Sequence, residues 1–164
     1  MNGFANAWAD AIVVCTNTMH RLADVIRSAV DVPLIHIADS TAAAVKAAGI
    51  EVVALLGTRY TMEQDFYVGR RRNMHGLTVI VPDEPDRTMI HTIIYDELVR
   101  GVINPESKCQ YLQVVERLLD RGALGVITAC TEIELLIRRE DLRAPMFPTA
   151  YLHALAVVDF ALAG

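Results

Sequence analysis

Short apolar runs alternate with longer amphipathic segments along this 164-residue chain. The runs have the length and composition of buried strands, and the segments between them have the 3.6-residue apolar period of helices. Such alternation is typical of a parallel sheet with helices on both faces, so the sequence predicts an α/β fold. Strands are expected near 11–15, 34–37, 52–57, 78–81, 125–129 and 146–147, and helices near 18–30, 39–49, 61–75, 86–101, 106–122, 133–139 and 149–163.

Two of the predicted strands run into a Cys-Thr pair where a helix begins. The first stretch reads Ala-Ile-Val-Val-Cys-Thr-Asn-Thr (11–18), and the second reads Gly-Val-Ile-Thr-Ala-Cys-Thr-Glu (125–132). When the strand starts are aligned, Thr16 lies opposite Cys130 and Cys15 is one residue early. Both copies continue through a helix to a proline, a further strand and an Ala-rich helix. The repeat predicts two pseudosymmetric parallel-sheet lobes whose strand ends share one cleft, where α/β sheets bind ligands.

The predicted lobes are unequal. Residues 1–35 and 138–164 would form an incomplete first lobe, and residues 36–137 the second. The first lobe is expected to be truncated at its N-terminus, because a strand as apolar as 11–14 needs parallel neighbours and covered faces, yet only about ten residues precede it. We expect the chain to begin partway through a βαβ unit, or a second subunit to supply the cover, as in a homodimer.

Composition limits the class of protein. Hydrophobic residues make up 53% of the chain, charged residues 21%, and the net charge is −5, which is typical of a slightly acidic globular protein. Nucleic acid is not an expected partner, because the one basic run, residues 70–72, lacks interleaved aromatic residues. The first ten residues lack the basic and apolar segments of a signal peptide, so none is expected, and no apolar run approaches the ~18 residues that span a bilayer. Three irregularly spaced cysteines predict free thiols and a cytoplasmic protein.

Cys130 is the strongest candidate for chemistry. A thiol between a parallel strand and a helix N-terminus lies among free backbone N–H groups and the positive end of the helix dipole, which should lower its pKa. Simple packing of a small buried side chain is the alternative. Asn17 and Thr18 offer an amide and a hydroxyl for a carboxylate or ammonium group, or for helix capping. Without a glycine-rich phosphate motif or a metal-ligand spacing, and with only two lysines, the sequence predicts no cofactor and no metal.

These stretches resemble the aspartate/glutamate racemase family. The resemblance rests on Cys-Thr-Asn-Thr-Met-His (15–20), Leu-Leu-Gly-Thr-Arg-Tyr-Thr-Met (55–62) and Ala-Cys-Thr-Glu-Ile-Glu-Leu-Leu (129–136), and it covers nearly the whole chain. The second Cys-Thr is followed by glutamate. In this respect the sequence resembles the aspartate and broad-specificity amino-acid racemase branch of the family, whereas glutamate racemases carry histidine at this position. The family also begins with a strand and a Gly-rich, Ser-containing loop that have no counterpart in this sequence.

The family implies a two-base mechanism without a cofactor, in which one thiolate removes the Cα proton and a thiol opposite returns one to the other face. By position, the resemblance makes Cys130 one acid/base. The other falls on Thr16 or Cys15, of which only one can face the cleft if the strand continues, and we expect Thr16. A threonine hydroxyl is a far poorer base than a thiolate, so the pair would be unequal and turnover favoured from one enantiomer. The residues expected to bind or orient the substrate are Asn17, Thr18, Thr61, Lys108, Thr131 and Glu132, of which Glu132 would position or tune the cysteine.

The expected function is therefore interconversion of the L and D enantiomers of aspartate or glutamate, and the expected partner is a small amino-acid substrate. Two alternatives stay open from the sequence. One is a truncated, non-catalytic remnant that binds small acidic ligands or a partner subunit. The other keeps the fold but changes the reaction to isomerisation or decarboxylation of a diacid.

Overall fold

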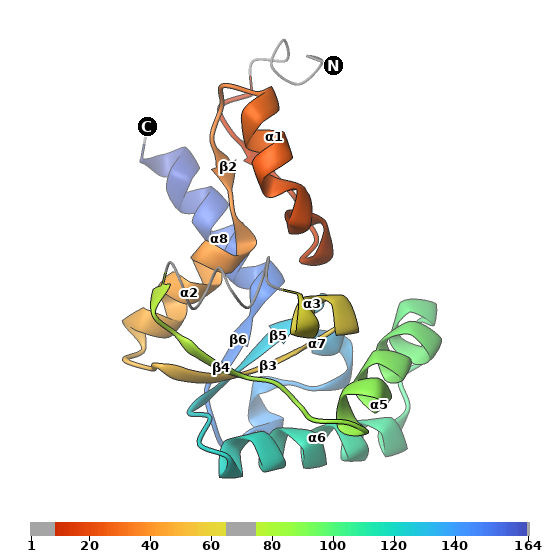
Figure 1. Cartoon of the computed structure of the whole chain (residues 1–164). Helices are drawn as coiled ribbons and strands as arrows, with labels where there is room; N and C mark the ends of the chain where they lie inside the picture. The colour runs from red at the N-terminus through yellow and green to blue at the C-terminus, as the bar shows by residue number, and fades with distance from the viewer. Residues whose placement is uncertain (1–8, 65–74, 164) are drawn as a thin grey trace.

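The computed structural model, which describes residues 9–64 and 75–163, confirms the parallel α/β fold (Figure 1). Its larger sheet has four strands in the order β4-β3-β5-β6, and its smaller sheet pairs β1 with β2. Every strand pair is parallel, and all six strands lie where the apolar runs predict them. The strands are β1 (Ile12–Val13), β2 (Leu34–Ile35), β3 (Val52–Gly57), β4 (Thr78–Ile80), β5 (Gly125–Ala129) and β6 (Met146–Pro148).

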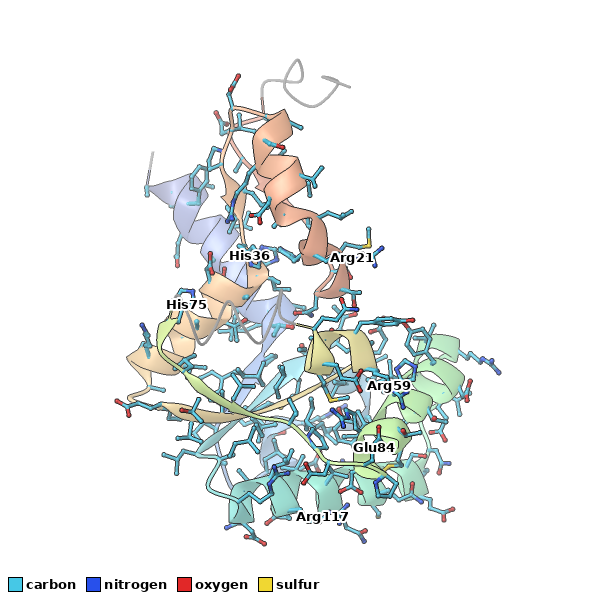
Figure 2. The ribbon with its side chains drawn as sticks, in the orientation of Figure 1. Arg21, His36, Arg59, His75, Glu84 and Arg117 are labelled. Carbon is cyan, nitrogen blue, oxygen red and sulfur yellow. The ribbon has the colours of Figure 1, made fainter. Side chains whose placement is uncertain are left out.

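Helices cover both faces of the larger sheet. Val53 and Leu55 face the apolar cluster under α2 (Ile37–Ala47), and Ala54 and Leu56 face the cluster under α5 and α6. Successive strand residues point to opposite faces, so a strand covered on both sides is a continuous apolar run. The side chain of His36 caps α2 by accepting a hydrogen bond from the backbone N–H of Ala38 at 3.1 Å (Figure 2).

The remaining helices connect the strands and complete the layers. The long C-terminal helix α8 packs mainly along α2 and also contacts β2, β5 and β6. In the part of the chain that the structure describes, no helix has both the length and the apolar character needed to cross a membrane. The bounds are η2 (Thr18–Leu22), α1 (Ala23–Ala29), α3 (Arg59–Glu63), α5 (Asp86–Thr92), η3 (Ile93–Glu97), η4 (Leu98–Arg100), α6 (Pro105–Asp120), α7 (Ile133–Leu136), η5 (Arg139–Asp141) and α8 (Thr149–Leu162).

Three predicted helices differ in type or continuity from the observed ones. The helix expected over 18–30 begins as the 3₁₀ turn η2 and becomes α-helical only at Ala23. The segment 86–101 is not one α-helix, because α5 passes into a π-helical turn, η3, and then a 3₁₀ turn that ends at Gly101 with a left-handed φ of 76°. A pattern of apolar residues indicates a helix but does not show where its hydrogen bonding changes from the α to the π type. The helix predicted over 61–75 is not continuous, because α3 ends at Glu63 and the backbone of Gln64 is extended; residues 65–74, with the basic run 70–72, lie outside the described residues.

The strand pairing also differs from the predicted lobe boundary. The sequence analysis assigns residues 138–164 to the first lobe, but β6 within that range pairs with β5 in the four-stranded sheet. A strand of three residues carries no signal for its neighbour, which explains the difference. Helix α8 follows β6 and contacts strands of both sheets, so it joins the two units.

Candidate active site

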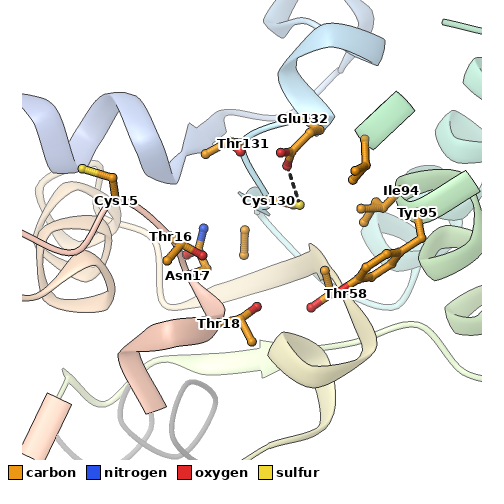
Figure 3. Close-up of a pocket in the computed structure, with 12 residues that line it drawn as sticks. Cys15, Thr16, Asn17, Thr18, Thr58, Ile94, Tyr95, Cys130, Thr131 and Glu132 are labelled. Atoms are coloured by element: carbon orange, nitrogen blue, oxygen red, sulfur yellow. Dashed lines mark hydrogen bonds between the residues drawn. The ribbon is translucent and has the colours of Figure 1, made fainter. Parts of the chain in front are cut away.

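The carboxyl ends of three strands converge on one pocket (Figure 3). Gly57 lies opposite Ala129 in the β3–β5 register, so the next residues, Thr58 and Cys130, emerge at the same edge of the sheet. The segment after β1 reaches this edge from the smaller sheet. The pocket has a volume of about 260 Å³ and is lined by Cys15, Thr16, Asn17, Thr18, Thr58, Ile94, Tyr95, Val99, Ala129, Cys130, Thr131 and Glu132.

Cys130 and Glu132 form a hydrogen-bonded pair in this pocket. The thiol of Cys130 packs against the apolar cluster under α5 and α6 and donates to the Glu132 carboxylate, with Sγ 2.9 Å from Oε2 (Figure 3). Burial, the hydrogen bond to this carboxylate and its negative charge together raise the pKa of Cys130 to about 12. The resting side chain is therefore a protonated thiol at neutral pH.

The sequence-based expectation of a lowered Cys130 pKa is thus wrong. The helix that follows, α7, has only four residues and contributes little dipole. The backbone hydrogen bonds of Thr131 and Glu132 do lower the pKa of Cys130, but burial and the neighbouring carboxylate outweigh them.

The Glu132 carboxyl group has a lowered pKa. Partial burial acts in the opposite direction, but hydrogen bonds from the Cys130 thiol and the Thr131 side chain stabilise the carboxylate more. The pair therefore holds one proton, on sulfur, and one negative charge, on Glu132. A proton on sulfur next to a carboxylate has a short path to an acceptor, so the pair can both donate and accept a proton.

Thr16 and Cys15 lie in the segment after β1, and both line the pocket. The prediction that only one of them can do so assumes a continuing strand, but β1 ends at Val13 and the alternation of side chains ends with it. In Figure 3 the side chain of Thr16 points toward the pocket, whereas the sulfur of Cys15 points away from Cys130.

Matching backbone hydrogen bonds of β1 and β5 identify equivalent positions in the two copies of the repeat. The backbone N–H of Ile12 donates to the carbonyl of Pro33 at 2.8 Å, and that of Val126 donates to the carbonyl of Pro145 at 2.9 Å. Counting four residues on from these matched bonds pairs position 16 with position 130, as the sequence repeat does. The structural repeat therefore supports Thr16 as the counterpart of Cys130.

Asn17 anchors this segment to the larger sheet. Its buried side-chain amide donates to Thr149 Oγ1 at 3.0 Å, and that hydroxyl donates to the carbonyl of Thr128 at 2.9 Å. Asn17 thus connects the residues after β1 to the end of β5, while Thr18 opens η2 and lines the pocket. Thr149 is not among the predicted site residues, although its place directly after β6 is the usual position for a polar residue at a sheet edge.

Two predicted substrate contacts lie outside the pocket lining. Thr61 is fully buried in α3, where its hydroxyl is 3.2 Å from that of Thr58, the residue that does line the pocket. Lys108 lies in α6, where its Nζ forms an ion pair with Asp141 Oδ2 at 2.7 Å. Spacing along the sequence places these side chains on helices but does not determine which face each helix presents to the site.

The wall formed by Ile94, Tyr95 and Val99 was also missed. These residues lie on the π-helical and 3₁₀ turns that follow α5, and such irregular turns are frequent at functional sites. The ring of Tyr95 packs against that of His91, with centroids 4.7 Å apart. In residues 9–64 and 75–163, no group of three or more His, Cys, Asp or Glu side chains is arranged to hold a metal ion.

Fold and pocket together define an α/β protein with a thiol and a carboxylate at the end of a parallel strand. A sequence model of the Asp/Glu/Hydantoin racemase family matches residues 2–157. The chain belongs to this family, which confirms the resemblance found in the sequence.

Solved structures are similar over almost the whole chain. A Yersinia pestis protein assigned to the Asp/Glu racemases is 49% identical with a TM-score of 0.93, and the match covers 96% of this chain and 69% of that one. An aspartate racemase homologue from Pyrococcus horikoshii is 31% identical with a TM-score of 0.88, covering 98% and 70%. The aspartate racemase of Picrophilus torridus, at 21% identity, shares the fold with a TM-score of 0.70, covering 95% and 64%.

Proposed function

We propose that this protein is an amino-acid racemase of the aspartate/glutamate type that works without a cofactor. The observation that carries the proposal is the meeting, in one pocket, of the Cys130–Glu132 pair with Thr16, its counterpart in the structural repeat. A racemase needs proton-transfer groups on opposite faces of Cα. A repeat that brings two equivalent strand ends to one pocket provides such positions.

The proposed chemistry begins with the proton on sulfur. When the Cys130 proton passes to Glu132 Oε2, the resulting thiolate removes the Cα proton, and the substrate is left as a carbanion next to its carboxylate. Return of that proton from Cys130 regenerates the same enantiomer, whereas a proton from the Thr16 side gives the other. When the same enantiomer is regenerated, Cys130 is again a thiolate and Glu132 returns its proton to it. When the other enantiomer forms, Cys130 keeps the Cα proton and the Thr16 side has lost one, so Glu132 releases its proton to solvent water and the Thr16 side takes one from water, which restores the starting state.

The two faces are expected to work at different rates. Thr16 has a hydroxyl, which is a weak acid and base, and the exposed thiol of Cys15 is the alternative group on that side. Exchange of the Cα proton with solvent at the Cys130 face should therefore be faster than inversion of the amino acid. Substrate binding is assigned to the hydroxyls of Thr18, Thr58 and Thr131, which surround the same space.

The positions of the lysines favour thiol chemistry over a pyridoxal Schiff base. The chain has two lysines, and both lie in its described part. Lys108 is paired with Asp141, Lys46 lies in the last turn of α2, and neither lines the pocket.

A product assay tests the proposal. The purified chain is incubated with each enantiomer of aspartate and glutamate, and the mixture is resolved by chiral chromatography, with Cys130→Ser as the control. Conversion by the wild type and loss in the variant is the expected result. Turnover of maleate or an arylmalonate would instead favour a diacid isomerase or decarboxylase, and calorimetric binding without turnover would favour a ligand-binding module.

A homodimer in the cytoplasm remains part of the proposal. Leu155, Val158 and Phe160 on α8 are apolar side chains with more than two fifths of their surface exposed, which supports a covering partner. Light scattering at several concentrations tests the assembly, and a monomer throughout would count against it. The three free cysteines are compatible with a reducing compartment.

A further inference from the structure

His20 is a buried imidazole next to the pocket that the proposed chemistry does not use. Only 2% of its surface is exposed, and it lies on η2, just after the residues that line the pocket. Its Nδ1 is 2.7 Å from the carbonyl oxygen of Thr16, and its Nε2 is 3.2 Å from the backbone nitrogen of Ile37. A carbonyl only accepts and a backbone N–H only donates, so Nδ1 carries the proton and Nε2 is an acceptor.

Two further histidines surround this ring. The centroid of the His36 ring is 4.4 Å from that of His20, and the centroid of His153 is 5.7 Å away. His36 is the N-cap residue of α2 (Figure 2), and His153 on α8 bonds through Nε2 to the carbonyl of Ile35 at 2.9 Å. The ring of His20 is thus held between η2, α2 and α8, which leaves it little freedom to turn.

The Thr16 carbonyl needs such a partner because it follows the end of β1, where the ladder to β2 has stopped. We propose that His20 is a positioning residue, which ties this carbonyl to the first turn of α2 and so fixes the pocket-lining residues 15–18 opposite Cys130. The inference rests on the proposed function. Because a displacement of about 1 Å can cost a hundredfold in rate, the bond would matter most for the proton that Thr16 or Cys15 delivers.

The ratio of inversion to exchange tests this role. In D₂O, His20→Ala is expected to slow inversion by about ten- to a hundredfold while slowing deuterium uptake at the Cys130 face by less than about threefold. His20→Asn, whose amide can still donate to the Thr16 carbonyl, should retain more inversion than His20→Ala. His75→Ala, at the partly buried pair with Asp39 outside the pocket lining, is the control and should change neither rate.

Two results would overturn the inference. If His20→Ala slows inversion and deuterium uptake equally, general destabilisation explains the loss; if it slows neither, His20 has no role in positioning. A second readout does not depend on turnover. Long-range ¹H–¹⁵N spectra of the wild type should show His20 as the neutral Nδ1-protonated form, and His20→Ala should shift the backbone amide signals of residues 15–18. An Nε2-protonated His20 would overturn the inference even in an active enzyme. A wild type that neither exchanges nor inverts, with the expected tautomer, would reject the proposed function and confine His20 to structure.

Discussion

At the scale of single residues, the site depends on the pairing of a thiol with a carboxylate. Helix N-termini usually favour thiolates, but burial of Cys130 and the Glu132 carboxylate, 2.9 Å from its sulfur, together reverse that effect and raise the pKa of the thiol. Both residues are recognisable in the sequence as neighbours in one motif. The protonation state of the thiol could not be predicted from the motif, because burial and the direction of a side chain are properties of the folded state.

Thiol alkylation tests this electrostatic account. With a pKa of about 12, Cys130 should react slowly with iodoacetamide at pH 8, and its rate should rise as the pH rises toward that value. Glu132→Gln removes the negative charge, so the pKa of Cys130 should fall and its alkylation at pH 8 should accelerate, about tenfold for each unit of pKa. Peptide mass spectrometry separates Cys130 from the exposed Cys15 and Cys109.

The matched control is Glu140→Gln, an exposed carboxylate in η5. It should leave the rate at Cys130 unchanged. If Glu132→Gln slows the alkylation of Cys130 or leaves it unaltered, the carboxylate does not hold the proton on sulfur. Glu132→Gln should also slow racemisation, because it removes the carboxylate that accepts the proton of the Cys130 thiol.

Substitutions at Thr16 and Cys15 test which residue acts opposite Cys130. Thr16→Cys should raise the slower direction of turnover by about tenfold or more, because a thiol is a far better acid and base than a hydroxyl. Cys15→Ala should have little effect. The two directions are measured by starting chiral assays from each enantiomer, and loss of activity in Cys15→Ala without a gain in Thr16→Cys would assign the role to Cys15.

At the scale of elements, the strands were predictable and the irregular turns were not. A strand covered on both faces, such as β3, is a continuous apolar run that the sequence reveals with its correct limits. The π-helical turn that carries Ile94 and Tyr95 has no such signal, so that wall of the pocket was missed. Thr61 and Lys108 were predicted as contacts because a motif gives order along the chain, but not the face that each helix presents.

The start of β5 gives a stability test of the sheet that carries Cys130. A Cβ added at Gly125 would lie 2.8 Å from Cε2 of Phe147 and 3.3 Å from Cδ1 of Ile50. Gly125→Ala should therefore lower the free energy of unfolding by about 1–3 kcal/mol, as measured by urea denaturation. In Gly125→Ala with Phe147→Leu the smaller side chain leaves room, so the combined loss should be smaller than the sum of the single losses. Simple additivity would show that the ring is not the obstacle.

At the scale of the whole molecule, the internal repeat joins the fold to the proposed function. The chain forms two units, each with a strand that donates to a proline carbonyl and runs on into the shared pocket. The helices that follow their second strands, α2 and α8, pack against each other. The repeat was readable in the sequence because both copies keep the order of strand, polar turn, helix and proline. The pairing of β6 with β5 could not be predicted from the sequence, because a strand of three apolar residues fits either sheet.

Exchange of the Cα proton tests the central claim most directly. Wild-type protein and Cys130→Ala are incubated with L-aspartate and with L-glutamate in D₂O, and the Cα proton signal is followed by NMR, with circular dichroism to verify that both proteins are folded. The account predicts deuterium uptake by the wild type and none by Cys130→Ala. Uptake that persists in Cys130→Ala, or no uptake by folded wild-type protein, would contradict it.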